Sequence, residues 1–372
     1  MKKHFVILMT GLGLCASSNL YAGNKDRSGQ GSATELLVNP WAASGGLFGL
    51  DAANVSGVEA MKVNIAGISS ANDMEFGAVH NTYIRSSGIS MIDAGIVKRM
   101  GKSGKNTVGV NLMSINYGDI PNTTVDNPNL SAGTYKPSFF NISIGYAHDF
   151  AKSITAGINF TFIQEGVPNV KSNAMGIDMG IKYTTGRNDN LHFGVTLRNV
   201  GTNIRFQGDG LSFSGLSPDQ STELTVQQRS EKFQLPTQLN IAVANDFYLG
   251  KRYLAVAKPT TTENEDGSPI ELSNKTENRL SAVGSFISNS FNNDYMGVGL
   301  EYAFKESFML RTAYRYEANI ANISTTTTFY KGLAVGAGVQ FASGKGKIAI
   351  DYCFKPTRFS TGVHTVGVRF IK

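Results

Sequence analysis

Residues 140–150, FNISIGYAHDF, show the pattern that decides the fold. From Phe140 to Tyr146 every second side chain is aliphatic or aromatic, and the side chains between them are small or polar. The same alternation continues in residues 154–162 and returns near the end of the chain in residues 348–354. Because successive side chains of a strand point to opposite faces, the pattern predicts a sheet with one apolar face and one polar face.

Strand length and charge placement distinguish a membrane barrel from a soluble sandwich. The alternating segments are about 10 residues long, which suits a tilted membrane crossing, whereas strands of soluble sheets average about 5–6 residues. The charged residues lie on the small-residue face, and they are Asp178, Lys182, Arg198, Glu301, Arg311, Arg315, Asp351 and Arg369. This leaves the other face apolar for lipid. The sequence therefore predicts an all-β, transmembrane antiparallel β-barrel over residues 74–372.

The number of strands follows from a count of the alternating segments. Fifteen segments can be marked between residues 74 and 370, and the weakest are 253–259 and 279–288. Since single-chain bacterial barrels have an even number of strands, we expect about 14. Three polar stretches read as long loops, residues 119–137, 202–237 and 260–278. Long loops of such barrels usually face the outside of the cell.

Residues 1–22 have the composition of a secretory signal peptide. A basic start and an apolar core over residues 5–14 precede small residues that lead to Ala22, the expected cleavage site. A lipoprotein signal would use Cys15, but the bulky leucine before it disfavours this alternative. We therefore expect an integral protein of the bacterial outer membrane, in contact with lipid and lipopolysaccharide.

Residues 23–73 lack the alternation of the rest of the chain. They read as short helical turns broken by glycine, and we expect them to form a plug folded into the lumen of the barrel. A disordered periplasmic tail is the alternative. The leucine, valine, tryptophan and phenylalanine content of this segment argues against full disorder.

Several short motifs follow one another in an order that points to a known family. The N-terminal ones are residues 30–37 (QGSATELL), Asn39-Pro40, 58–60 (VEA) and Asn64-Ile65-Ala66-Gly67, and the later ones include 178–183 (DMGIKY) and 197–201 (LRNVG). This order resembles the PorV/PorQ family, outer-membrane proteins of the Bacteroidetes type IX secretion system that are related to the fourteen-stranded FadL-like barrels. The resemblance marks Asn39, Pro40, Asn64, Ala66 and Gly67 as a plug motif. Trp41 and Ile65 depart from the typical family block.

The resemblance implies a role without catalysis. PorV-like proteins are shuttles that bind the C-terminal signal domains of secreted cargo, and PorQ-like proteins anchor a surface partner of the attachment complex. The expected partners are therefore secreted cargo proteins or proteins of the translocon and attachment complex. The alternative is a FadL-like transporter that passes hydrophobic small molecules through a lumen gated by the plug.

No motif for catalysis, a cofactor or a metal ion stands out. The histidines beyond residue 22 lack the i, i+4 spacing of a metal pair, and no G-x-S-x-G motif occurs. A barrel phospholipase, whose serine and histidine meet only in the fold, is the enzymatic alternative. The formal net charge is +6, without a basic cluster that would indicate nucleic-acid binding.

The charges on the small-residue face are the first candidate site. Buried charges persist only when they are paired or hydrated, so we expect a ladder of charges that fills the lumen and clasps the plug. Its predicted members are Asp178, Lys182, Glu301, Arg311, Arg315, Asp351 and Arg369. The alternative is an open aqueous pore lined by single charges.

The loop over residues 202–237 is the second candidate site. A simple connection between strands needs only about 2–5 residues, so the extra length suggests a surface that binds a protein partner. Aromatic and aliphatic side chains often dominate such interfaces, and the expected anchors are Phe206, Phe213, Leu216 and Phe233. A loop that packs on itself or on lipopolysaccharide sugars is the alternative. The prediction is that the loops, rather than the lumen, carry the function.

Overall fold

The computed structural model describes residues 27, 29–84, 87–101, 103–123, 128, 133–186, 188–254, 274–322, 328–344 and 346–372. The signal peptide predicted over residues 1–22 lies outside these residues, as does most of the loop predicted over residues 260–278. Within the described part of the chain, no helix is long and apolar enough to cross a membrane.

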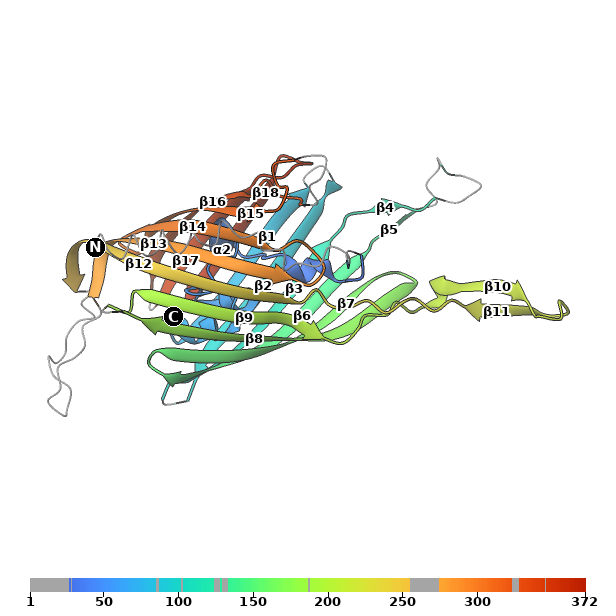
Figure 1. Ribbon diagram of the computed structural model, residues 1–372, viewed down its shortest axis with the longest axis horizontal. Coiled ribbons are helices and arrows are strands. Elements are labelled where there is room, and N and C mark those ends of the chain that lie inside the picture. The colour runs from blue at the N-terminus through green and yellow to red at the C-terminus, as the bar shows by residue number, and fades with distance from the viewer. Residues whose placement is uncertain are drawn as a thin grey trace.

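Fourteen antiparallel strands close into a barrel (Figure 1), which confirms the predicted fold class and strand number. Its first and last strands, β1 (Met74–Ile84) and β18 (Val363–Ile371), pair directly, with Phe76 opposite Phe370. The strands between them are β2 (Ile89–Met100), β3 (Asn106–Asn116), β6 (Ser138–Ala151), β7 (Ile154–Val167), β8 (Val170–Thr185), β9 (Leu191–Gly201), β12 (Gln238–Leu254), β13 (Asn274–Asn289), β14 (Tyr295–Phe304), β15 (Phe308–Glu317), β16 (Leu333–Ser343) and β17 (Gly346–Lys355).

The alternation directs apolar side chains outward and small or polar side chains inward. Along β6, Ile144 is 56% exposed on the outer face, whereas Ser143 and Gly145 on either side of it are buried. Met175 and Ile181 of β8 are exposed in the same way, while Asp178 and Lys182 are buried. The barrel therefore presents an apolar exterior suited to lipid and a polar lumen.

The segment predicted at residues 253–259 is not a separate strand. β12 continues as one strand to Leu254 and pairs along its length with β13, with an irregular register between Leu249 and Arg252. The other weak segment, residues 279–288, lies within β13. Because the segment that begins at residue 253 joins the preceding predicted segment in β12, the fifteen predicted segments become fourteen strands.

The two ends of the barrel differ. At one end, which we call the long-loop end, residues 117–137 connect β3 to β6 and residues 202–237 connect β9 to β12. Two hairpins project from this end in Figure 1, and they pair β4 (Ile120–Pro121) with β5 (Thr134–Tyr135) and β10 (Ser212–Leu216) with β11 (Glu223–Gln227).

The two strands that flank the predicted loop over residues 260–278, β12 and β13, meet at the end of the barrel opposite to the other two predicted loops. β12 runs from Gln238 at the long-loop end to Leu254 at the opposite end, which we call the short-turn end, and β13 begins there. Residues 274–278 are part of β13. The side of a loop follows from its place in the order of antiparallel strands, whereas the prediction relied on length and polarity.

Residues 29–73 lie inside the barrel, and we call this segment the plug (Figure 1). It contains four short helical turns, η2 (Thr34–Leu37), α2 (Ala42–Gly46), η3 (Gly57–Lys62) and η4 (Ile65–Ser70). The side chains of Trp41, Leu50, Val58 and Ile68 are almost completely buried. They belong to a core that includes lumenal side chains of the wall, such as Val79.

Glycines of the wall allow the plug to approach the strands closely. A Cβ atom on Gly194 of β9 would lie 2.4 Å from the Ala52 carbonyl oxygen, and one on Gly180 of β8 would lie 2.1 Å from Asn64 Oδ1. Carbon atoms do not come this close to their neighbours, so a larger residue at either position requires the plug to shift. The glycines on the polar face of the strands thus match the shape of the plug.

Candidate functional site

A wall arginine connects the plug to the barrel by ion pairs. The Nε atom of Arg369 on β18 lies 3.2 Å from Oε1 of Glu59 in the plug. The same guanidinium lies 2.8 Å from Asp351 Oδ2 on β17 and 3.6 Å from Glu75 Oε1 on β1. One guanidinium therefore contacts three carboxylates, of which one belongs to the plug.

The ion pairs continue across the neighbouring strands. Arg311 lies between Asp351 and Glu301, with its Nη1 2.6 Å from Asp351 Oδ1 and its Nε 2.5 Å from Glu301 Oε2. Arg279 of β13 lies 2.8 Å from Glu301 Oε1 and extends the network to Glu306 at 2.7 Å. The structure thus joins four of the predicted ladder residues, Glu301, Arg311, Asp351 and Arg369, in one network.

Sequence reasoning missed several members of this network, namely Glu59, Glu75, Arg279, Glu306 and Asp246, whose Oδ1 lies 3.7 Å from Arg279 Nη1. Arg279 lies in β13, the strand whose alternation was weakest, so its inward direction was not evident. Glu59 lies in the plug, where no alternation indicates which way a side chain points. Glu75 lies on β1 and Arg369 on β18, and these two strands pair when the barrel closes. Their positions on the first and last strands are the one signal that could have predicted this contact.

The other three predicted ladder residues, Asp178, Lys182 and Arg315, lie outside this network. Asp178 of β8 accepts hydrogen bonds from the Asn199 backbone at 2.7 Å and from Asn159 Nδ2 at 3.0 Å. Lys182 donates to the Val55 carbonyl of the plug at 2.7 Å. Arg315 lies near the long-loop end. Asp178 and Lys182 are remote from the network because β8 is distant from β14–β18 around the barrel.

The predicted plug motif makes local hydrogen bonds. Asn64 precedes η4, accepts a hydrogen bond from the Ala66 backbone at 3.2 Å and donates to the Ala52 carbonyl at 2.7 Å. The Pro40 carbonyl accepts a hydrogen bond from Asn81 of β1 at 2.8 Å. Asn39 donates to Ser44 Oγ at 2.9 Å. A Cβ atom on Gly67 would lie 2.4 Å from the Val55 carbonyl oxygen, so this position accepts only glycine without a shift.

Burial changes the electrostatics of the plug. Burial raises the pKa of Glu59 to about 7, and the positive charge of Arg369 opposes this change. Burial lowers the pKa of Lys62, which donates a hydrogen bond to Asn141 Oδ1 at 2.8 Å and lies 3.9 Å from Asp93. The ion pairs to the wall therefore favour the charged form of each group against the cost of burial.

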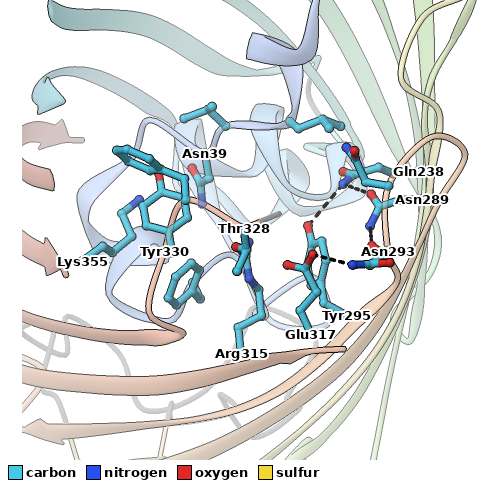
Figure 2. Close-up of a pocket in the computed structure, with 15 residues that line it drawn as sticks. Asn39, Gln238, Asn289, Asn293, Tyr295, Arg315, Glu317, Thr328, Tyr330 and Lys355 are labelled. Atoms are coloured by element: carbon cyan, nitrogen blue, oxygen red, sulfur yellow. Dashed lines mark hydrogen bonds between the residues drawn. The ribbon is translucent and has the colours of Figure 1, made fainter. Parts of the chain in front are cut away.

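A cavity of about 260 Å³ lies between the plug and the wall at the long-loop end (Figure 2). It is lined by Leu37, Val38, Asn39, Phe48, Gln238, Asn289, Asn292, Asn293, Tyr295, Arg315, Glu317, Thr328, Phe329, Tyr330 and Lys355. The amide of Gln238 donates to Asn289 at 2.7 Å, and Asn293 donates to Glu317 at 3.2 Å. The cavity thus combines an aromatic part with polar side chains, and no motif in the sequence indicates it.

The four predicted partner-binding residues have two different environments. Phe206 and Phe233 contact each other edge to face, with ring centroids 6.2 Å apart, and pack on a buried cluster that includes Ile204 and Leu235. Both side chains are thus partly buried, and their role in binding a partner stays a prediction. Phe213 and Leu216 lie on the projecting hairpin and are 54% and 66% exposed.

Comparison with solved structures places the architecture among known channels. The Pseudomonas putida toluene transporter TodX aligns with 90% of this chain and 97% of its own, at 13% identity and a TM-score of 0.51. The CymD monoaromatic hydrocarbon channel aligns with 90% of this chain and 96% of its own, at 11% identity and a TM-score of 0.51. The barrel has the FadL-like fold.

A Pseudomonas aeruginosa FadL homologue aligns over 86% of this chain and 94% of its own, at 12% identity and a TM-score of 0.45. No protein-family model matches this FadL-like chain, and no curated protein sequence matches it. The resemblance to PorV and PorQ remains a prediction from the sequence.

Proposed function

We propose that the protein is an outer-membrane channel for small hydrophobic molecules, with a lumen gated by the plug. The observation that carries this proposal is the cavity between plug and wall at the long-loop end, inside a barrel whose fold is that of hydrocarbon channels. A molecule that enters from this end meets the plug before it can cross the barrel. Movement of the plug would then control passage.

The ion pairs of Arg369 and Arg311 suit a gate that stays closed by default. The pair between Arg369 and Glu59 attaches the plug to β18, and Arg311 shares the carboxylate of Asp351 with Arg369, while shape complementarity at Gly180 and Gly194 holds the other side of the plug. The function proposed here is the alternative considered from the sequence, and it replaces a role in secretion as the main proposal.

The proposal predicts faster uptake of toluene by whole bacterial cells that express the protein. Cells that carry an empty vector provide the baseline, and cells that express the barrel without residues 29–70 show whether the plug limits passage. We expect the intact protein to raise the initial rate of labelled toluene uptake without admitting a sugar of similar size. Uptake at the empty-vector rate, with folded protein in the membrane, would contradict the proposal.

Binding of a protein partner at the long-loop end is a second candidate function. The hairpin of β10 and β11 is isolated from the barrel in Figure 1, and Phe213, Leu224 and Val226 are exposed on one of its faces. A two-stranded hairpin is only marginally stable in water, so a partner that covers this face would stabilise it. Secreted cargo or an attachment protein of a type IX system is the partner that the sequence resemblance suggests.

Replacement of residues 212–227 by a short Gly/Ser turn separates the two functions. We expect the shortened protein to keep its toluene uptake, because the hairpin does not line the cavity. If the second function holds, affinity purification of the intact protein from its native outer membrane recovers a partner that the shortened protein loses. Equal recovery from both proteins would exclude the hairpin as the binding surface.

A further inference from the structure

Two cationic side chains face the cavity without a carboxylate partner in the described residues. Lys355 is 4% exposed, and its ammonium group lies 5.6 Å from the centre of the Tyr330 ring, with no hydrogen bond or ion pair among those residues. Arg315 donates one hydrogen bond, to Thr328 Oγ1 at 3.3 Å, and its buried Nε has no acceptor in the described part of the chain. By contrast, Arg311 and Arg369 each contact at least two carboxylates.

Aromatic rings hold the guanidinium of Arg315 in place. Its central carbon lies 4.6 Å from the centre of the Phe48 ring, 4.5 Å from that of Tyr295 and 5.4 Å from that of Tyr330. Such contacts attract a cation but do not neutralise its charge. The guanidinium is thus fixed in position and keeps hydrogen-bonding capacity for an anion.

Only one carboxylate lines the cavity among the described residues. Glu317 accepts a hydrogen bond from Asn293, and it lies more than 4 Å from both cations, since no ion pair joins them in that part of the chain. Figure 2 shows Glu317 and Asn293 on one side of the cavity, Lys355 and Tyr330 on the other, and Arg315 between them. Arg315 and Lys355 are positive and Glu317 is negative, so the formal charge of the lining is positive. Lys355 lies on the side of the cavity away from Glu317 (Figure 2).

We propose that this cavity binds a small aromatic carboxylate, with its carboxylate between Lys355 and Arg315. A buried ammonium group without a partner is costly, and an anionic ligand removes that cost. Leu37, Val38 and Phe329 supply apolar surface for the ring. The volume of about 260 Å³ lies below the range of roughly 300–1,000 Å³ for drug-sized ligands, which favours a ligand with a single ring.

The inference rests on the proposed function, because it names the class of molecule that the channel accepts at its long-loop end. It distinguishes this chain from the hydrocarbon channels of similar fold by the charge of the ligand. Phe48 and Val38 belong to the plug, so a ligand in this cavity contacts the gate as well as the wall.

Isothermal titration calorimetry on the full-length protein in detergent tests the inference, with sodium benzoate as the probe. Benzamide has nearly the same shape without the charge, and we expect it to bind at least about tenfold more weakly, as loss of a charge-assisted hydrogen bond implies. Acetate carries the charge without the ring and is also expected to bind more weakly. Equal affinity for benzoate and benzamide, or for benzoate and acetate, would overturn the inference.

Substitution of Lys355 gives the second measurement. Lys355→Met keeps the length of the side chain and removes its charge, so we expect benzoate affinity to fall at least about tenfold. Lys355→Arg keeps the charge and is expected to retain most of the affinity, which guards against a loss due to misfolding. Lys331→Met removes an exposed cation that does not line the cavity, and it is the matched control.

Toluene uptake by cells that express the intact protein, measured beside benzoate binding, separates this inference from the proposed function. If benzoate fails to bind the intact protein while toluene uptake persists, the inference is wrong and the channel function stands. If benzoate binds and depends on Lys355 while no uptake occurs, the anion site stands and the channel function is wrong.

Discussion

Replacement of Arg369 by methionine is expected to open the lumen to ions. Without the guanidinium, the carboxylates of Glu59, Glu75 and Asp351 lose a shared cation. Removal of one partner from a buried ion pair typically costs about 3–5 kcal/mol. Because Glu59 belongs to the plug, much of this cost weakens the attachment of the plug to the wall. We therefore expect small currents from the native protein in planar bilayers and large, frequent openings from the variant.

Two further variants decide whether the effect arises at the plug. Lys98→Met removes an exposed cation of β2 near the same end of the barrel, and it is expected to conduct like the native protein. The double variant Glu59→Gln, Arg369→Met is expected to lose less stability of the closed plug than the two single variants lose together. The reason is that the effects of substitutions at contacting residues are not additive. If the Arg369→Met protein folds and stays closed to ions, the ion pair between Arg369 and Glu59 is not needed to hold the plug.

Replacement of Gly194 by valine is expected to displace the plug by steric conflict alone. A Cβ atom at this position would lie 2.4 Å from the Ala52 carbonyl oxygen and 2.8 Å from the Ala53 Cα atom. Both are backbone atoms, which cannot turn aside as a flexible side chain can. The plug must therefore leave its position on β9, and we expect raised conductance together with rapid proteolysis of residues 29–73 in detergent.

Gly284→Val is the matched control for this substitution. Gly284 lies on β13, and the nearest atom to a Cβ there would be 3.9 Å away, within ordinary contact distance. The control should keep its plug protected from protease and its pore closed. Protection of the plug in the Gly194→Val protein would mean that β9 moves outward to accommodate the new side chain.

The barrel could be predicted from the sequence because its main signal is local. Alternation in segments such as residues 140–150 records which face meets lipid, and this requires no knowledge of neighbouring strands. The signal weakens where a strand carries inward charge, as at Arg279 on β13, and there the boundaries were wrong. The side on which residues 260–278 emerge depended on the strand order, which one segment cannot reveal.

The site was less predictable because it depends on contacts between distant parts of the chain. Alternation identified Glu301, Arg311 and Asp351 as lumenal, but only the order of strands around the barrel shows that Asp178 is remote from them. The plug has no regular period, so the positions of Glu59 and Phe48 could not be read from it. The cavity beside Lys355 exists only because the plug lies where it does.

The pairing of β1 with β18 has a consequence for biogenesis. The residue that holds Glu59 lies on β18, the strand whose pairing with β1 completes the cylinder. The plug precedes β1 in the chain, whereas Arg369, which pairs with Glu59 of the plug, belongs to β18, the last strand of the barrel. Closing the cylinder and forming the ion pair between Arg369 and Glu59 are therefore coupled, so we expect the plug to be held in the lumen only once β18 has paired with β1.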